Sequence, residues 1–304
     1  DPLTHQKIVE LAEQAGLPPG VLNVVHGGRE TVESMCDHPD IVGVSFVGSS
    51  DVARVVHTRA SASGKRVQAL GGAKNYMIVL PDADMDASLE ACSGSIFGST
   101  GQRCLAGSVI VGVGDAHAQI RERMLDSAAS IQLGDGLQPT TDMGPVISAA
   151  HRDRVNGFIE QGVSDGAKLS LDGRGATVDG LPGGYWVGAT IFEDVPPDAS
   201  IATEEVFGPV AGINRAKDVD EAVRMMHASR YGNACSIFTT SGKTAREFRY
   251  RAGISMIGVN VGVAAPMAFF PFGGSKNSFY GDLKAQGRDS ISFYTDQRVV
   301  ISRW

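Results

Sequence analysis

Apolar residues in the first part of the chain follow two different periods. At positions 4–15 they recur every three or four residues, which is the spacing of a helix with one buried face. Elsewhere they gather in short runs between polar segments, which is typical of strands. The predicted order is a helix at 4–15, a strand at 22–25, a helix at 30–36, a strand at 42–47, a helix at 50–60 and a strand at 66–70. Strands separated by helices indicate βαβ units in a parallel sheet.

The pattern restarts at Tyr76, after a Gly-containing seam at 70–72 that we interpret as a domain boundary. A Gly/Pro-rich stretch at 172–188 interrupts the alternation and is predicted to be a loop. We predict strands at 76–80, 108–113, 235–239, 256–260 and 298–302, and helices at 86–97, 116–129, 148–162, 219–229 and 243–251. The chain is therefore predicted to be an α/β protein with room for two domains.

Composition excludes several classes of function. The 304 residues are 42% hydrophobic and 20% charged, which is ordinary for a globular protein. The net charge is −7 and the basic residues form no run, so we expect no nucleic-acid partner. No apolar stretch approaches the roughly 20 residues that span a bilayer, so we expect no membrane partner.

The cysteines and histidines narrow the chemistry further. The four cysteines show no disulfide framework, and neither they nor the seven histidines have metal-ligand spacing. We therefore expect no metal site and a reducing compartment. The cytoplasm is the expected location, with the mitochondrial matrix as the alternative.

Cys104 is the candidate nucleophile. Its neighbours Gly101, Gln102 and Arg103 are too polar for a core, and the cationic Arg103 would favour the thiolate. A small buried hydrophobe is the alternative interpretation. Residues 65–81 contain no Asp or Glu, and no acidic residue stands near Cys104 in the sequence to act as its base. An acyl-cysteine without a base favours a thiol, and not water, as the second substrate.

Three further segments could bind a cofactor or line a pocket. Gly48 and Ser49 join a predicted strand to a predicted helix, whose first N–H groups suit a pyrophosphate, although Ser49 could be a plain N-cap. One carboxylate of the pair Glu204 and Glu205 could clamp ribose hydroxyls, with Phe207 packing on an aromatic ring, or the segment could be a solvated acidic loop. The Gly-rich turn at 270–278 could close a hydrophobic pocket or be a packing corner.

Together these motifs resemble the aldehyde dehydrogenase superfamily. The matching segments stand in the family's order at 46–50, 101–104, 204–210 and 271–274, and the resemblance covers the whole chain. Segments 72–75, 81–84, 278–282 and 293–304 are similar to its CoA-acylating methylmalonate-semialdehyde dehydrogenase branch. The implied parts are the second half of a Rossmann-like NAD-binding domain at 1–70, a parallel-sheet catalytic domain at 71–272, and a return segment with an oligomerisation strand at 273–304.

The resemblance also implies a role for each site residue. Cys104 would attack an aldehyde, give up a hydride to NAD, and hold a thioester until CoA accepts the acyl group. Its backbone N–H would donate to the oxyanion. The residues implied for NAD are Gly48 and Ser49 at the pyrophosphate, Glu205 at the nicotinamide ribose, and Phe207 and Gly71 beside the nicotinamide. The implied substrate is methylmalonate or malonate semialdehyde, and the implied assembly is a homo-oligomer, a dimer or a tetramer.

Two departures from the family change the expectation. Leu70 stands where hydrolytic members have a water-activating Glu, which favours CoA because a thiol with a pKa of about 8.5 ionises more readily than water. The family's N-terminal part, with an oxyanion-hole Asn and an adenosine-binding Lys, is not among these residues. We therefore expect an N-terminally truncated fold with weak or no activity, and poor independent folding of residues 1–70.

Arg103 is a candidate partner for the substrate's carboxylate. Two rival hypotheses stay open beside the CoA-acylating enzyme. One is a hydrolytic aldehyde dehydrogenase that releases a free acid, with Glu204 or Glu205 as the base. The other is a catalytically inactive fragment or assembly subunit that associates through the strand at 298–302.

Overall fold

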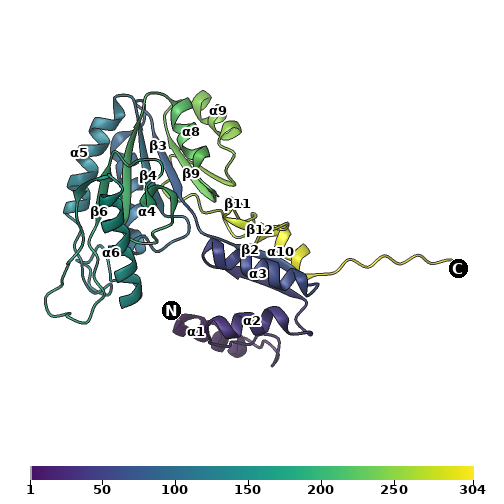
Figure 1. Ribbon diagram of the computed structural model, residues 1–304. Helices are drawn as coiled ribbons and strands as arrows, with labels where there is room; N and C mark the ends of the chain where they lie inside the picture. Colours follow the sequence, from purple (N-terminus) through teal and green to yellow (C-terminus); the bar gives the residue numbers. More distant parts are fainter. Residues whose placement is uncertain (1) are drawn as a thin grey trace.

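A seven-stranded sheet and a three-stranded sheet organise the chain, whose computed structural model describes residues 2–304 (Figure 1). The larger sheet has the order β10-β9-β3-β4-β7-β6-β5, and its neighbours are parallel except for β5 with β6. Its strands are β3 (Asn75–Val79), β4 (Gly107–Val113), β5 (Lys168–Leu171), β6 (Thr190–Glu193), β7 (Val210–Ala216), β9 (Ala234–Phe238) and β10 (Met256–Val259). The predicted parallel α/β sheet is confirmed.

Helices cover both faces of the larger sheet. All residues of the inner strand β3 are buried, because successive side chains of a strand point to opposite faces and both faces are covered here. Met77 and Val79 enter a core with α4 (Met85–Phe97) and α5 (Ala116–Ala129), whereas Ile78 enters a second core with α8 (Val219–Ala228) and α9 (Gly242–Arg251). A third core lies under α6 (Ala149–Ser164) and the short α7 (Ser200–Thr203).

The smaller sheet joins the two ends of the chain. Its order is β1-β2-β12, with β1 (Gly43–Val47) parallel to β2 (Arg66–Leu70) and β12 (Phe279–Gly281) antiparallel to β2. The helix α3 (Ser50–Ala62) packs on this sheet. A two-stranded ladder of β8 (Tyr231–Gly232) with β11 (Ser275–Lys276) ties the returning chain to the larger unit, and α10 (Gly287–Tyr294) follows β12.

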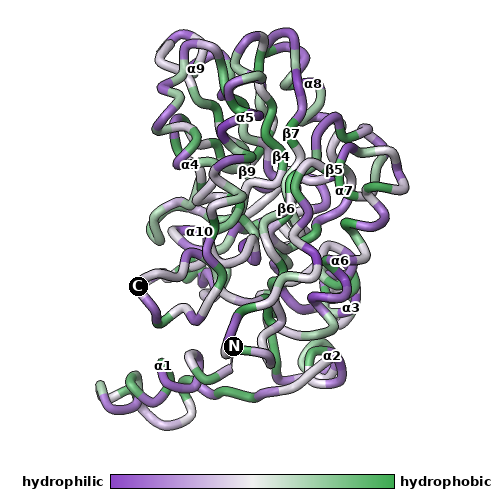
Figure 2. The backbone as a smooth tube through the Cα atoms, turned by 90° about the vertical axis from the view of Figure 1, so that its left-hand side faces the viewer, coloured by the Kyte–Doolittle hydropathy of each residue, from purple (hydrophilic) through white to green (hydrophobic). Residues whose placement is uncertain are grey.

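The first helices lie outside these cores. In Figures 1 and 2, α1 (Pro2–Gln14) and α2 (Arg29–Asp37) lie beyond α3, at the periphery of the molecule. None of the residues of α1 is buried, and α2 buries only Cys36. The apolar face that predicted α1 therefore has no covering surface within residues 2–304. None of the helices in this range is long and apolar enough to cross a membrane.

The structure differs in several places from the elements predicted from the sequence. Residues 22–25 form no strand, since this apolar run finds no neighbouring strand within residues 2–304 and Val25 is exposed. Residues 298–302 are irregular and exposed, and the oligomerisation strand expected there stays a prediction because it would pair with a second copy of the chain. The strand β7 at the middle of the larger sheet was not predicted, because Gly212 and Asn214 break the apolar run. The domain boundaries at 70 and 272 stay predictions.

Candidate active site

One cavity of about 500 Å³ collects the candidate nucleophile and the candidate NAD-binding residues named from the sequence. The nucleophile candidate Cys104 lines it, and so do Gly48, Ser49, Gly71, Glu205 and Phe207. The remaining lining residues are Val47, Ser50, Asp51, His151, Arg154, Glu204, Arg230 and Tyr231. Residues at the end of β1 and the start of α3 thus line one part of the cavity, and residues of the larger unit line the rest. The cavity lies between the two sheets.

A left-handed turn delivers Cys104 to this cavity. After α4, Ser99 (φ 52°), Thr100 (φ 58°) and Gly101 (φ 66°) all have positive φ, which is costly for the two residues that carry a side chain. The hydroxyl of Thr100 donates to the carbonyl oxygen of Gly144 at 3.1 Å and holds the turn. A Cβ at Gly101 would lie 2.2 Å from the carbonyl oxygen of Gly208, so only glycine permits this approach. The turn therefore packs Cys104 against the segment that carries Glu205 and Phe207.

The surroundings of Cys104 shift the pKa of its thiol in opposite directions. Burial raises its pKa, and the charge of Glu205 adds to the rise. Hydrogen bonding from the backbone N–H groups of Cys104 and Leu105 lowers it. The resting thiol is thus protonated near neutral pH, with backbone dipoles in place to stabilise a thiolate.

The turn before α3 presents helix N–H groups to the cavity. Ser49 occupies the N-cap position, but its side chain makes no capping hydrogen bond. The first N–H groups of a helix have no partner within the helix, and they carry the positive end of its dipole. The N–H of Gly48 donates to the carbonyl oxygen of Leu70 at 3.0 Å, which fixes the turn to the end of β2. This arrangement could hold an anionic group.

Ser50 connects this helix start to the Gly71–Gly72 turn. Its hydroxyl accepts the N–H of Gly72 at 3.0 Å and donates to the carbonyl oxygen of Asn277. The N–H of Gly71 donates to the carbonyl oxygen of Ser278 at 2.9 Å. The start of α3 and the returning chain at 277–278 therefore fix the backbone at Gly71, where a side chain would enter occupied space.

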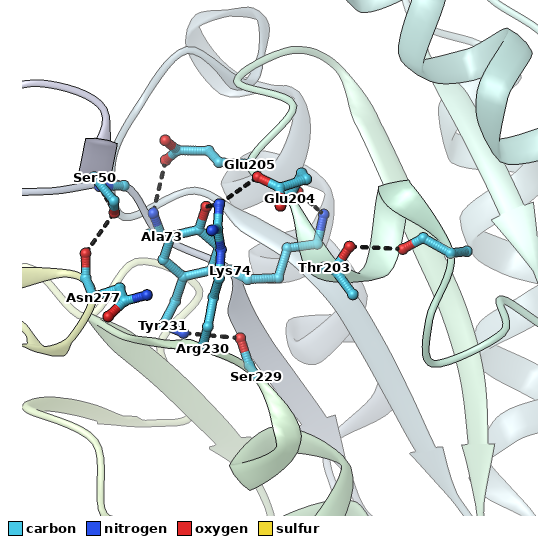
Figure 3. A network of polar contacts seen from close by, with 12 residues as sticks. Ser50, Ala73, Lys74, Thr203, Glu204, Glu205, Ser229, Arg230, Tyr231 and Asn277 are labelled. Carbon is cyan, nitrogen blue, oxygen red and sulfur yellow. Dashed lines mark hydrogen bonds and ion pairs between the residues drawn. The ribbon is translucent and has the colours of Figure 1, made fainter. Parts of the chain in front are cut away.

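Glu205 belongs to a partly buried polar network (Figure 3). Its Oε1 accepts the N–H of Ala73 at 3.1 Å, and the Nζ of Lys74 donates to the carbonyl oxygen of Glu204 at 2.9 Å. Burial raises the pKa of Glu205 to about 7, although the Ala73 N–H and the charges of Lys74 and Arg154 oppose the rise. Burial lowers the pKa of Lys74 to about 8. Both groups therefore change charge near physiological pH, and Glu205 does so in the cavity that it shares with Cys104.

Side chains of α6 fix the backbone around Phe207, which itself has a positive φ of 57°. His151 contacts the carbonyl oxygen of Phe207 through Nε2 at 2.7 Å. Arg154 donates from Nη1 to the carbonyl oxygen of Val206 at 2.8 Å and from Nη2 to that of Glu205 at 3.0 Å. The position of the backbone that carries the Glu205 and Phe207 side chains thus depends on α6.

Sequence reasoning missed several of these residues. His151 and Arg154 stand three positions apart and share one helix face, but nothing in the sequence says that this face meets the cavity. Arg230 forms an ion pair with Glu204 and donates to the hydroxyl of Tyr231 at 2.8 Å, again without a sequence signal.

Two expectations need correction. The statement that no acidic residue is near Cys104 holds along the chain but not in space, because Glu205 lines the same cavity. Arg103 does not line that cavity: its Nη2 donates to the carbonyl oxygens of Gly94 at 2.6 Å and Ser95 at 2.9 Å, at the end of α4. The guanidinium is therefore directed away from the site where a substrate carboxylate would lie.

Several known proteins are similar to this chain in both sequence and fold. The sequence model of the aldehyde dehydrogenase family matches residues 1–300. Malonate-semialdehyde dehydrogenase 1 of Geobacillus kaustophilus is 48% identical over 303 residues, which is 100% of this chain and 62% of that protein. The crystal structure of the methylmalonate-semialdehyde dehydrogenase of Oceanimonas doudoroffii has a TM-score of 0.95 and 41% identity, and the match covers 98% of this chain and 61% of that one.

A third relative was solved with a bound ligand. It is a Sinorhizobium meliloti chain in complex with NAD, whose proposed name is methylmalonate-semialdehyde dehydrogenase. Its TM-score is 0.97 at 42% identity, and the match covers 100% of this chain and 62% of that one. The chain thus spans about three fifths of the length of the relatives that it matches. Because the family model matches nearly all of its residues, the chain belongs to the aldehyde dehydrogenase family.

Proposed function

We propose that this chain carries the site of an NAD-dependent, CoA-acylating oxidation of a short acidic semialdehyde, methylmalonate or malonate semialdehyde. The observation that supports the proposal best is the single cavity shared by Cys104, the start of α3 and Glu205. The names of relatives that are 48% and 41% identical support the substrate class.

Cys104 performs the covalent chemistry in this proposal. The thiol first releases its proton to solvent. The thiolate sulfur then forms a bond to the aldehyde carbon, and the carbonyl oxygen becomes an oxyanion that the backbone N–H of Cys104 stabilises. Loss of a hydride from the carbon of this adduct leaves a thioester on Cys104. The sulfur of CoA then attacks the thioester carbon, and the C–S bond to Cys104 breaks and restores its thiolate.

The residues around the cavity fit an NAD molecule. The first N–H groups of α3, after Gly48 and Ser49, suit a pyrophosphate because they combine unpaired donors with the helix dipole. Glu205 would accept hydrogen bonds from ribose hydroxyls, while Gly71 and Phe207 would contact the nicotinamide ring. When bound, NAD supplies the acceptor for the hydride. The complex of NAD with a relative that is 42% identical supports this assignment.

CoA is the proposed acceptor because the end of β2 offers no base for water. Leu70, which stands where hydrolytic members have a Glu, is buried and cannot take a proton. A thiol with a pKa of about 8.5 is partly ionised at neutral pH and therefore needs less assistance from a general base than water does. Under this proposal, the cavity serves NAD and the CoA thiol in turn.

Hydrolysis is the second candidate function, and one observation favours it. Glu205 lies in the cavity with a pKa raised to about 7, which is the range expected of a general base. If Glu205 activated water, the product would be a free acid and CoA would not be required.

A single assay separates these possibilities. NADH formation from methylmalonate semialdehyde is measured with and without CoA, and the product is identified by mass spectrometry as acyl-CoA or free acid. Cys104→Ser should abolish turnover, whereas Cys36→Ala, which changes a cysteine of α2 outside the cavity, should retain it. Equal rates with and without CoA and release of free acid would favour hydrolysis.

If the chain shows no turnover by itself, the acyl-transfer step at Cys104 can still be tested. Incubation with methylmalonyl-CoA should transfer the acyl group to Cys104, which peptide mass spectrometry detects without any redox step. Absence of both turnover and acylation of Cys104 would instead favour a non-catalytic chain.

We further propose that the protein is a homo-oligomer located in the cytoplasm. The apolar side chains at 299–301 are exposed and are available for contact with a second copy. The four cysteines are free, which a reducing compartment would preserve.

A further inference from the structure

The carbonyl oxygen of Cys104 accepts hydrogen bonds from two buried side-chain amides. The Nδ2 of Asn75, at the start of β3, donates to it at 3.0 Å, and the Nδ2 of Asn233, between β8 and β9, donates at 2.9 Å. Both side chains are almost fully buried, at 4% and 5% exposure. Two amides from segments far apart in the sequence thus converge on one peptide oxygen, next to the nucleophile.

Asn75 is itself held in place by three hydrogen bonds. Its Nδ2 also donates to the carbonyl oxygen of Ala106 at 2.8 Å, and its Oδ1 accepts the N–H of Ala234 at 3.1 Å. For Asn233, the bond to the Cys104 oxygen is the one side-chain hydrogen bond found within residues 2–304. Asn75 therefore also supports the sheet, whereas the amide of Asn233 is directed to the Cys104 carbonyl.

The carbonyl oxygen of Cys104 and the N–H of Leu105 belong to the same planar peptide group. In a trans peptide the C=O and the following N–H point in opposite directions, so fixing the oxygen fixes the direction of the N–H. This N–H is one of the two backbone groups that favour the thiolate of Cys104. Hydrogen bonds to the oxygen also polarise the peptide and make its N–H a stronger donor.

We propose that Asn75 and Asn233 are positioning residues, which hold the Cys104–Leu105 peptide so that its N–H stabilises the sulfur of Cys104 as an anion. This inference rests on the proposed role of Cys104 as nucleophile. It adds a second layer of residues that tune this nucleophile without contacting substrate. It also explains why two polar amides are buried at the meeting point of β3, β4 and β9.

Asn233→Ala tests the proposal, because it removes the amide while Asn75 continues to support the sheet. The rate of alkylation of Cys104 by iodoacetamide is followed by peptide mass spectrometry from pH 7 to pH 10. We expect the rate at pH 7 to fall about three- to fivefold, which corresponds to the loss of one hydrogen-bond contribution. The deficit should narrow as the pH rises, because the thiol of the variant then ionises as well.

The matched control is Asn214→Ala. Asn214 lies on β7, and its Oδ1 accepts the N–H of Val195 at 3.0 Å. The Asn214 side chain does not hydrogen-bond to Cys104. The alkylation profile of this variant should superimpose on that of the parent chain. An Asn233→Ala profile identical to the parent would overturn the proposal. A deficit that is constant at every pH would overturn it too, since altered access to the sulfur would then be the cause.

Asn233→Ser covers the case in which the alanine variant does not fold. Its hydroxyl is too short to reproduce the amide contact, so the profile should shift in the same direction; a superimposable profile would again overturn the proposal. Alkylation requires neither aldehyde, NAD nor CoA. The positioning role can therefore fail while CoA-dependent turnover is observed, and it can hold while the proposed substrate proves wrong.

Discussion

Burial and backbone dipoles, and not neighbouring charges in the sequence, control the ionisation of the residues around Cys104. Glu205 and Lys74 come from distant segments, and their altered pKa values arise because the polypeptide removes both from water. The residue types of the site could be predicted, since Cys104 and Glu205 stand in distinctive motifs. Asn233 and Arg154 could not, because their importance depends on which backbone oxygen each one reaches.

Glu205→Gln should make the protein more stable at neutral pH. A carboxyl whose pKa is raised on folding contributes stability that is present below its unfolded value, near 4.3, and is lost as the pH rises through about 7. The amide cannot ionise, and its oxygen can still accept the N–H of Ala73. We expect the variant to gain about 1–3 kcal/mol over the parent at pH 8 and little at pH 4.5.

Urea unfolding at both pH values measures this difference. An equal effect at pH 4.5 and pH 8 would show that packing, and not the charge of Glu205, is responsible. The same variant should bind NAD less tightly, because a neutral amide is a weaker acceptor than a carboxylate for ribose hydroxyls.

At the level of elements, the site depends on a tight junction between β2, α3 and the returning chain. A Cβ at Gly71 would lie 2.6 Å from the carbonyl oxygen of Asn277 and 2.7 Å from the Oγ of Ser50. Because the first of these is a backbone atom, the junction cannot accommodate a methyl group without moving. Gly71→Ala should therefore cost about 1–3 kcal/mol of unfolding free energy and weaken NAD binding.

Gly157→Ala is the matched control for this substitution. Gly157 lies inside α6, and a Cβ there would meet nothing within 4 Å. Alanine favours a helix, so this variant should gain about 0.5–1 kcal/mol. Chemical denaturation of both variants provides the comparison, and an equally stable Gly71→Ala variant would contradict the proposed tight junction.

The elements themselves were predictable to the extent that local pattern determines them. The predicted strand at 66–70 and the helix at 116–129 coincide with β2 and α5. The failures have a common physical origin, because a strand requires a partner that the local sequence does not contain. Residues 22–25 are apolar without a partner, and β7 is interrupted by Gly212 yet forms between β4 and β6.

At the scale of the whole molecule, the chain leaves apolar surface exposed at both ends. Leu3 and Ile8 of α1 are exposed, and the extended segment after α10 leads away from both sheets (Figure 1). Val299 and Ile301 in that segment are 85% and 94% exposed. Apolar β-branched residues in an extended segment favour pairing with the edge of a sheet, and a second copy of the chain offers such an edge.

We therefore expect the chain to self-associate through its C-terminal segment, as a dimer or a tetramer. Ile301→Glu should shift the mass measured by light scattering toward that of one chain, because burying an unpaired carboxylate in an apolar contact is costly. Leu137→Glu introduces the same charge at a side chain that is 89% exposed in a loop, and it should leave the mass unchanged. Cys104 lies in the cavity between the sheets, away from this segment, so its alkylation should continue in the Ile301 variant. If both variants have the mass of the parent, the segment does not make the contact, and the exposed face of α1 becomes the surface to test.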